Sequence, residues 1–116
     1  MADLGRWTRA VRTGMGADPA VGAVVPPIYL STNYLFDGMG QPGAYDYSRS
    51  NNPTRDLLSD ALATLEGGAG ATAVGTGLAA ITLIAEAFIP AGGRAVVQHD
   101  AYGGTWRLFA FLAEQG

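Results

Sequence analysis

The hydrophobic pattern of the chain becomes periodic only after Asn52 and Pro53. From there, apolar side chains recur at helical spacing and form one face, at Leu57, Leu58, Ala61, Leu62 and Leu65. Because asparagine is a good N-cap and proline suits the first helical turn, we predict that a helix begins after Asn52. The pair Gly67 and Gly68 predicts its end.

The remainder of the second half alternates predicted strands and helices. In chain order the pattern predicts a strand over Ala71–Val74, a tight turn at Gly75–Gly77, a helix over Leu78–Phe88, a turn over Pro90–Gly93, a strand over Arg94–Gln98, and a helix from Trp106 to about Glu114 capped by Thr105. The middle helix is apolar almost all round, so we expect it to be buried on both sides. This alternation predicts the α/β class with a parallel sheet. Since two strands cannot form the stable centre of such a sheet, we expect the chain to be the N-terminal part of a larger protein, or to be completed by another chain.

Residues 1–52 show little periodicity. A short helix is predicted over Arg6–Thr13, ending at Gly14. Pro-Pro and Pro-Gly pairs then separate short aromatic and aliphatic runs, which is typical of extended segments and loops. The aromatic residues argue against a flexible leader, because disordered segments contain few of them. We therefore divide the chain into an extended arm, residues 1–52, and the first part of an α/β domain, residues 53–116.

The composition excludes several kinds of chemistry. The 116 residues contain no lysine and no cysteine, and His99 is the single histidine. The chain therefore has no lysine of its own for a Schiff base, and it cannot form disulfides or a cysteine-based or histidine-rich metal site. A net charge of −3 argues against a nucleic-acid partner. No apolar run reaches membrane-spanning length and no signal peptide is evident, so we expect no membrane partner and a cytoplasmic location.

The segment Gly75–Ala80 joins a predicted strand to the apolar helix. Its glycines allow close approach to the backbone, and a helix start offers unpaired N–H groups, so the segment suits a phosphate. Two interpretations are open on these residues. The segment fits G-x-G-x-x-A, and Asp100 at the end of the next strand could hold a ribose, as in an NAD-type dinucleotide site. Alternatively, the phosphate belongs to a smaller cofactor whose ring stacks on Tyr102.

A more specific pattern is Tyr-Asp-Tyr-Ser-Arg-Ser-Asn-Asn-Pro-Thr-Arg at Tyr45–Arg55, with Val24–Ser31 before it and Leu65–Gly68, Gly75–Ala80 and His99–Thr105 after it. These segments, in this order, resemble the Cys/Met-metabolism enzymes that use pyridoxal 5′-phosphate (PLP). The resemblance covers the chain from about Thr8 onward. It implies the aspartate-aminotransferase-like fold, PLP-dependent transferase fold type I, with an N-terminal arm that reaches the neighbouring subunit and the start of the large PLP-binding domain. It also implies a homodimer or homotetramer with shared active sites.

The resemblance implies roles for individual residues. Tyr47 and Arg49 would bind the cofactor phosphate of the neighbouring subunit, a task that suits a phenol and a planar guanidinium. Gly77 and Leu78 would offer backbone N–H groups to the phosphate of the cofactor in their own subunit. Tyr102 would stack on the pyridine ring and act as an acid or base.

Within the family, Asp46 and Trp106–Phe109 are most similar to the cystathionine γ-synthases. This similarity implies γ-replacement on an O-acyl-L-homoserine, succinyl or acetyl, by L-cysteine to give L-cystathionine, in transsulfuration and methionine biosynthesis. Asp46 and Arg107 would then bind substrate, Arg107 through the carboxylate of a succinyl group. Ser50 departs from the succinyl-type bacterial pattern, so the acetyl ester stays open, as do a cystathionine γ-lyase and an O-acylhomoserine sulfhydrylase. The family's PLP lysine is absent from these residues, so we expect the chain alone to be inactive; a non-catalytic docking fragment is the alternative of another class.

Overall fold

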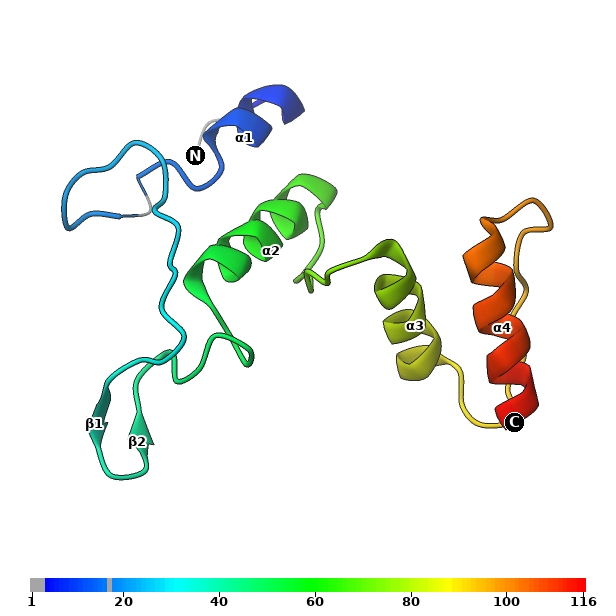
Figure 1. The fold of residues 1–116 in the computed structure, drawn as a ribbon. Coiled ribbons are helices and arrows are strands. Elements are labelled where there is room, and N and C mark those ends of the chain that lie inside the picture. The colour runs from blue at the N-terminus through cyan, green and yellow to red at the C-terminus, as the bar shows by residue number, and fades with distance from the viewer. Residues whose placement is uncertain (1–3, 17) are drawn as a thin grey trace. The chain divides into compact units, whose positions relative to one another are not determined.

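The computed structural model describes residues 4–16 and 18–116 (Figure 1). Its elements, in chain order, are α1 (Arg6–Arg12), β1 (Phe36–Gly38), β2 (Gln41–Pro42), α2 (Pro53–Glu66), α3 (Gly77–Phe88) and α4 (Gly103–Gln115). The chain forms two compact units, one up to Ala73 and one from Val74. The first unit contains α1, α2 and the two strands, and the second contains α3 and α4.

Helix α2 begins and ends where the local sequence predicts. The side chain of Asn52 accepts a hydrogen bond from the backbone N–H of Thr54 at 2.9 Å, and Pro53 occupies the first turn. At the other end Gly67 has a left-handed backbone conformation with φ of 68°, which favours glycine. Both predicted boundaries are therefore confirmed.

The first unit also contains the short predicted helix and a hairpin that the sequence did not predict. Helix α1 ends with Thr13 as its C-cap, and the ion pair between Arg6 and Glu66, at 3.0 Å, joins it to α2. The strands β1 and β2 pair antiparallel, with Phe36 opposite Pro42. This hairpin is too short and too rich in glycine to show a period-two pattern.

Helices α3 and α4 pack together in the second unit. The side chain of Thr76 caps α3 by accepting a hydrogen bond from the N–H of Ala79 at 3.0 Å, and α3 starts one residue earlier than predicted. The expectation that α3 is buried on both sides is wrong for this chain, since Ala85 is its one buried residue and Phe88 is 80% exposed. Helix α4 is the only helix of this unit that covers it, so the opposite face stays open.

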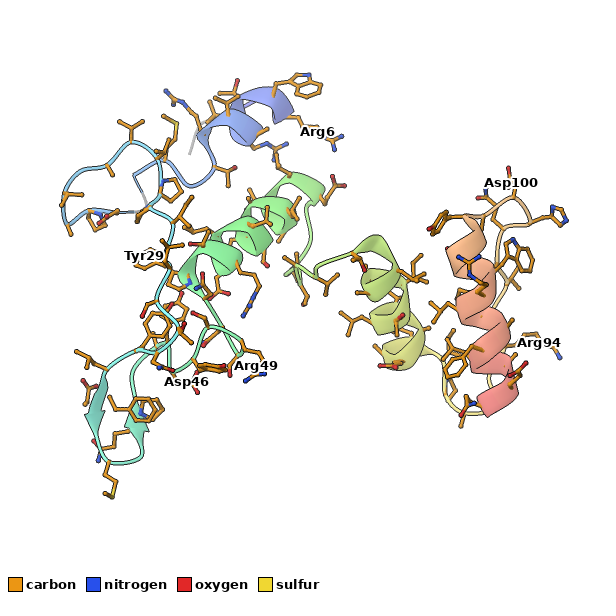
Figure 2. The ribbon with its side chains drawn as sticks, viewed as in Figure 1. Arg6, Tyr29, Asp46, Arg49, Arg94 and Asp100 are labelled. Carbon is orange, nitrogen blue, oxygen red and sulfur yellow. The ribbon has the colours of Figure 1, made fainter. Side chains whose placement is uncertain are left out.

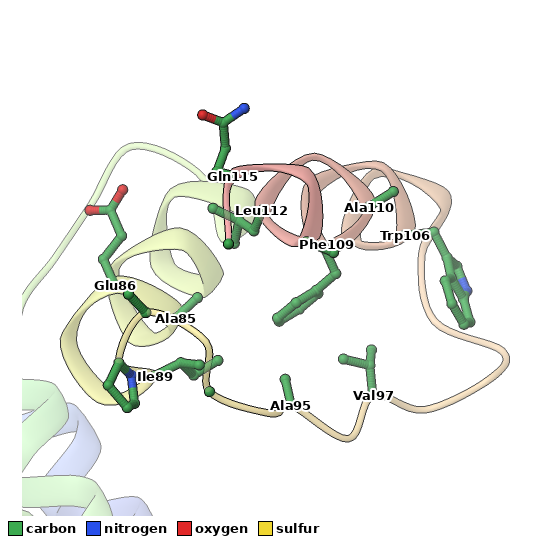
Figure 3. A pocket seen from close by; sticks show the side chains of 15 residues that line it. Ala85, Glu86, Ile89, Ala95, Val97, Trp106, Phe109, Ala110, Leu112 and Gln115 are labelled. Atoms are coloured by element: carbon green, nitrogen blue, oxygen red, sulfur yellow. The ribbon is translucent and has the colours of Figure 1, made fainter.

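The predicted strands Ala71–Val74 and Arg94–Gln98 do not form. Within 4–16 and 18–116, the only sheet is the β1–β2 hairpin, because a strand requires a hydrogen-bonded neighbour and neither segment has one. The second segment still alternates like a strand. Ala95 and Val97 line a hollow of about 590 Å³ beside α3 and α4, whereas Val96 between them is 96% exposed (Figure 3).

The start of α4 also differs from the prediction. The helix begins at Gly103, Tyr102 is its N-cap residue, and no side chain caps it. Thr105 lies inside the first turn, where it is only 7% exposed and its N–H donates to the carbonyl of Tyr102 at 2.8 Å. Thr105 is therefore a buried helical residue, and the predicted capping role is wrong. In the part of the chain that the structure describes, every helix is too short or too polar to cross a membrane.

Candidate functional site

The turn that carries Tyr47 and Arg49 is fixed by backbone hydrogen bonds. Before the turn, Tyr47 forms an antiparallel bridge with Asn33. After it, the N–H groups of Ser50 and Asn51 both donate to the carbonyl of Tyr47, at 2.9 and 3.1 Å. The chain therefore reverses direction directly after Tyr47, and Arg49 lies exposed on the outside of the turn.

The side chains of Tyr47 and Arg49 lie next to each other. Figure 2 labels Arg49 close to Asp46 on the same segment. The Nη2 atom of Arg49 donates to the Tyr47 hydroxyl at 2.9 Å, and its Cζ atom lies 5.0 Å from the centre of the tyrosine ring. Since the hydroxyl accepts this bond, its own proton stays available to a ligand. A permanently charged guanidinium beside a phenol donor is well suited to a phosphate.

Asp46 lies at the start of the same turn, where it is half-buried. Its Oδ1 atom accepts from the backbone N–H of Tyr47 at 2.6 Å, and its carbonyl accepts from the N–H of Tyr34 at 3.1 Å. These bonds hold the carboxylate against the main chain of the turn. The structure thus places Asp46, Tyr47 and Arg49 together.

A small hollow of about 200 Å³ lies beside α2 and is lined by Tyr29, Tyr45, Asp56 and Asp60 among others. Burial, followed by the neighbouring carboxylate of Asp56, raises the pKa of the Tyr45 phenol above its ordinary value of 10.0. The tyrosine is therefore held in its neutral form, in which its hydroxyl can donate to a carboxylate.

The other predicted phosphate ligands lie at the start of α3. Gly77 and Leu78 are the first two residues of α3, so their backbone N–H groups have no partner inside the helix, whereas the N–H of Ala79 is capped by Thr76. A Cβ atom added at Gly75 or Gly77 would meet nothing within 4 Å, and neither glycine has a left-handed φ. Neither packing nor backbone conformation within the described residues explains these two glycines, so the space in front of the helix is open to a ligand.

Tyr102 and Arg107 belong to the start of α4. The Tyr102 side chain is 75% exposed, and its ring lies over Gly104, where an added Cβ would be 2.5 Å from the ring atom Cε1. Arg107 is exposed one turn further on, with its Nη1 atom 3.9 Å from the Cβ position of Gly103. The ring atoms Cδ1, Cε1 and Cζ of Tyr102 thus lie against Gly104, while most of the residue stays exposed.

The sequence profile described as "Cys/Met metabolism PLP-dependent enzyme" matches residues 7–116. The chain belongs to this family. It is 52% identical over 109 residues to cystathionine gamma-synthase of Escherichia coli strain K12, a match that covers 94% of this chain and 28% of that enzyme. It is 45% identical over 102 residues to the Bacillus subtilis cystathionine gamma-synthase/O-acetylhomoserine (thiol)-lyase, covering 88% of this chain and 27% of that protein.

Solved structures of the family share the fold of this chain. The crystal structure of cystathionine gamma synthase from Xanthomonas oryzae pv. oryzae, in complex with aminoacrylate and cysteine, superposes with a TM-score of 0.91 at 55% identity, over 99% of this chain and 30% of that one. The metB structure from Corynebacterium glutamicum superposes with a TM-score of 0.88 at 31% identity, over 97% of this chain and 30% of that one. The predicted fold class, the N-terminal region of PLP-dependent fold type I, is confirmed. The chain spans less than a third of the length of these relatives.

The donor groups described above fit a PLP phosphate. The cofactor's phosphate is a dianion, and the chain offers a guanidinium with a phenol on one turn and backbone N–H groups at a capped helix start. An exposed aromatic ring at Tyr102 is available for stacking on a pyridine. Asp100, which the dinucleotide interpretation needs for a ribose, accepts a hydrogen bond from Gln98 at 2.6 Å, and membership of this family favours the single phosphate.

The sequence did not reveal the contacts that two supporting residues make with the candidate site. Arg55 donates to the carbonyls of Ser48 and Ser50, and Gly104 carries the ring of Tyr102. An arginine in the first turn of a helix opposes the helix dipole, and this was the signal for Arg55. The sequence does not single out Gly104, because the neighbouring residue Gly103 is also a glycine.

Proposed function

We propose that this chain supplies the phosphate-binding and ring-stacking segments of a PLP-dependent enzyme that replaces the acyl group of an O-acyl-L-homoserine, succinyl or acetyl, by L-cysteine, giving L-cystathionine. This is a step of transsulfuration and methionine biosynthesis. The observation that carries the proposal is the turn at Tyr47 and Arg49, whose paired donors fit a phosphate, in a chain 52% identical to a cystathionine gamma-synthase. A cytoplasmic location and an assembly of like subunits belong to the same proposal.

The cofactor would be held by two sets of groups. Tyr47 and Arg49 would bind the phosphate of the neighbouring subunit's PLP, and the N–H groups of Gly77 and Leu78 that of their own subunit. Tyr102 would stack on the pyridine ring and move a proton as acid or base. When bound, PLP withdraws electrons from the substrate's carbon skeleton, which makes loss of the γ-substituent possible. The lysine that holds PLP would come from outside residues 1–116, so these residues alone would be inactive.

The substrate would be recognised by two polar residues, Asp46 and Arg107. The resemblance to the cystathionine γ-synthases implies that Asp46 would lie beside the distal end of the substrate, and one oxygen of its carboxylate accepts from the N–H of Tyr47. Arg107 is exposed on α4, five positions after Tyr102, and its guanidinium could pair with the free carboxylate of a succinyl ester. An acetyl ester has no such carboxylate, so Arg107 would distinguish the two esters.

The experiment is a chimera in which residues 7–116 replace the matching segment of E. coli cystathionine gamma-synthase. We expect it to form cystathionine from cysteine and an O-acyl-homoserine, and Arg49→Met to weaken PLP binding by about 10- to 100-fold. Arg107→Met should lower kcat/KM for the succinyl ester more than for the acetyl ester. A chimera that binds PLP but turns over neither ester would contradict the proposal.

A second candidate function is supported by the B. subtilis relative, which carries the names of both a cystathionine gamma-synthase and an O-acetylhomoserine (thiol)-lyase. Sulfide offered in place of cysteine tests it, and cystathionine offered as substrate tests a γ-lyase. Turnover of sulfide or cystathionine above that of cysteine with acyl-homoserine would favour these alternatives. If the segment binds the rest of the E. coli enzyme without restoring any activity, a docking fragment is the better description.

A further inference from the structure

One side chain of α2, Arg55, adds to the backbone hydrogen bonds that hold the turn at Tyr47 and Arg49. The guanidinium of Arg55 donates through Nη1 to the carbonyl of Ser48 at 3.1 Å and through Nη2 to the carbonyl of Ser50 at 2.9 Å. These two carbonyls flank Arg49 on either side in the chain. A single planar group therefore holds the peptide unit that leads into Arg49 and the peptide unit that follows Ser50, so the segment carrying Arg49 is fixed at both ends.

The position of Arg55 is unfavourable for its charge unless the side chain has such partners. It is the third residue of α2, where the helix dipole favours acidic residues and disfavours cations. Two carbonyl oxygens supply compensating negative charge, and hydrogen bonds from a charged donor are stronger than neutral ones. A lysine could not reproduce the arrangement, because its ammonium is a point donor and not a planar fork.

We infer that Arg55 is a positioning residue for cofactor binding, which orients Tyr47 and Arg49 for a phosphate by holding the carbonyls of Ser48 and Ser50 and does not bind the phosphate itself. This inference rests on the proposed function. It assigns to the signature's final arginine a task distinct from that of Arg49. The other bonds of the turn leave the Ser48–Ser50 peptides without a second side-chain donor from α2, so loss of Arg55 should loosen Arg49 while the helix remains folded.

The test is a double-mutant cycle in the chimera described above, with PLP titrated into the apoenzyme. We expect Arg55→Met to raise the PLP dissociation constant by about 10-fold or more, with kcat at saturating PLP and KM for the acyl-homoserine within about threefold of the parent. Arg55→Lys keeps the charge and one hydrogen bond, so its dissociation constant should lie between the two. Because Arg55 acts through Arg49, Arg55→Met should add little in an Arg49→Met background.

The matched control is Arg12→Met, which removes an exposed arginine from α1 and should leave PLP affinity unchanged. The melting temperature of the apoenzyme separates positioning from folding. Unchanged PLP affinity in both Arg55 variants overturns the inference, whether or not the melting temperature falls, and so does full additivity with Arg49→Met. If Arg49→Met binds PLP as tightly as the parent, the proposed phosphate role is wrong and the inference fails with it. If Arg49→Met weakens PLP binding but the Arg55 variants do not, the inference is wrong and the proposed function stands.

Discussion

Replacing Gly104 with alanine tests how the ring of Tyr102 is held. In a helix, alanine is ordinarily favoured over glycine by up to about 1 kcal/mol, so the substitution should stabilise α4 if nothing else changes. Here the new Cβ atom would lie 2.5 Å from Cε1 and 3.0 Å from Cδ1 of Tyr102. Real Cβ atoms do not approach ring carbons this closely, so the ring has to move.

The ring can move without unfolding the helix, because the Tyr102 side chain is 75% exposed. Rotation away from its preferred side-chain conformation costs about 0.5–1.5 kcal/mol, which offsets the gain from alanine. We therefore expect the free energy of unfolding to change by no more than about 1 kcal/mol. Loss of one aromatic stacking contact is worth about 0.5–1.5 kcal/mol, so PLP affinity should fall by about 2- to 12-fold.

The assay is PLP titration of the chimeric apoenzyme together with its melting temperature, and Gly103→Ala is the matched control. The neighbouring position has room, since a Cβ there meets only Arg107 Nη1 at 3.9 Å. Gly103→Ala should therefore keep PLP affinity and leave the melting temperature equal or slightly higher. Equal PLP affinity for the two alanine variants would refute the argument that Gly104 sets the position of the Tyr102 ring.

Three further predictions concern stability. Asn52→Ala removes the cap of α2, so amide exchange in the first turn of α2 should accelerate by about 2- to 30-fold, corresponding to about 0.5–2 kcal/mol. Asn52→Asp keeps the cap acceptor but loses the bonds that the amide donates to Tyr29, Tyr34 and Ser48, so it should recover only part of this effect. Equal rates in both variants would contradict the capping role. Thr76→Ala should accelerate exchange at the start of α3 to a similar extent and weaken PLP binding, whereas Thr76→Ser should do neither. The raised pKa of Tyr45, caused by burial and then by Asp56, means that its contribution to stability is complete below pH 10.0 and is lost as the pH rises through the raised pKa. Melting temperatures from neutral to strongly alkaline pH should therefore fall less steeply for Tyr45→Phe than for the parent, and parallel curves would refute this.

The parts of the fold that the sequence predicted are those fixed by neighbouring residues. Asn52 and Gly67 set the ends of α2 through bonds that span only a few positions, and Thr76 does the same at the start of α3. The prediction of strands at 71–74 and 94–98 was wrong, because strand formation depends on partner strands that are distant in the sequence. The alternation of Ala95, Val96 and Val97 persists, but a periodic pattern records which face is apolar and not whether a neighbour is present.

The candidate site divides in the same way. The family signature pointed to Tyr47 and Arg49 as candidate phosphate ligands, since the motif is contiguous, and the structure places their side chains in contact. The contacts that hold them could not, because Arg55 reaches backward to two main-chain carbonyls and any residue type offers a carbonyl. Gly104 was equally hidden, since its role depends on the direction of the Tyr102 ring and not on a property of glycine visible in the sequence.

The groups proposed to contact the cofactor are held by contacts within their own unit. The turn at Tyr47 is bonded to Asn33 and to Arg55, the start of α3 is capped by Thr76, and the ring of Tyr102 rests on Gly104. By contrast, large apolar side chains such as Met39 and Val96 are almost fully exposed, and a hollow of about 590 Å³ lies open beside α4. Large exposed apolar patches are typical of surfaces that take part in protein–protein contacts. The local geometry of each element proposed to bind the cofactor therefore depends on bonds within its own unit and not on the exposed apolar surfaces.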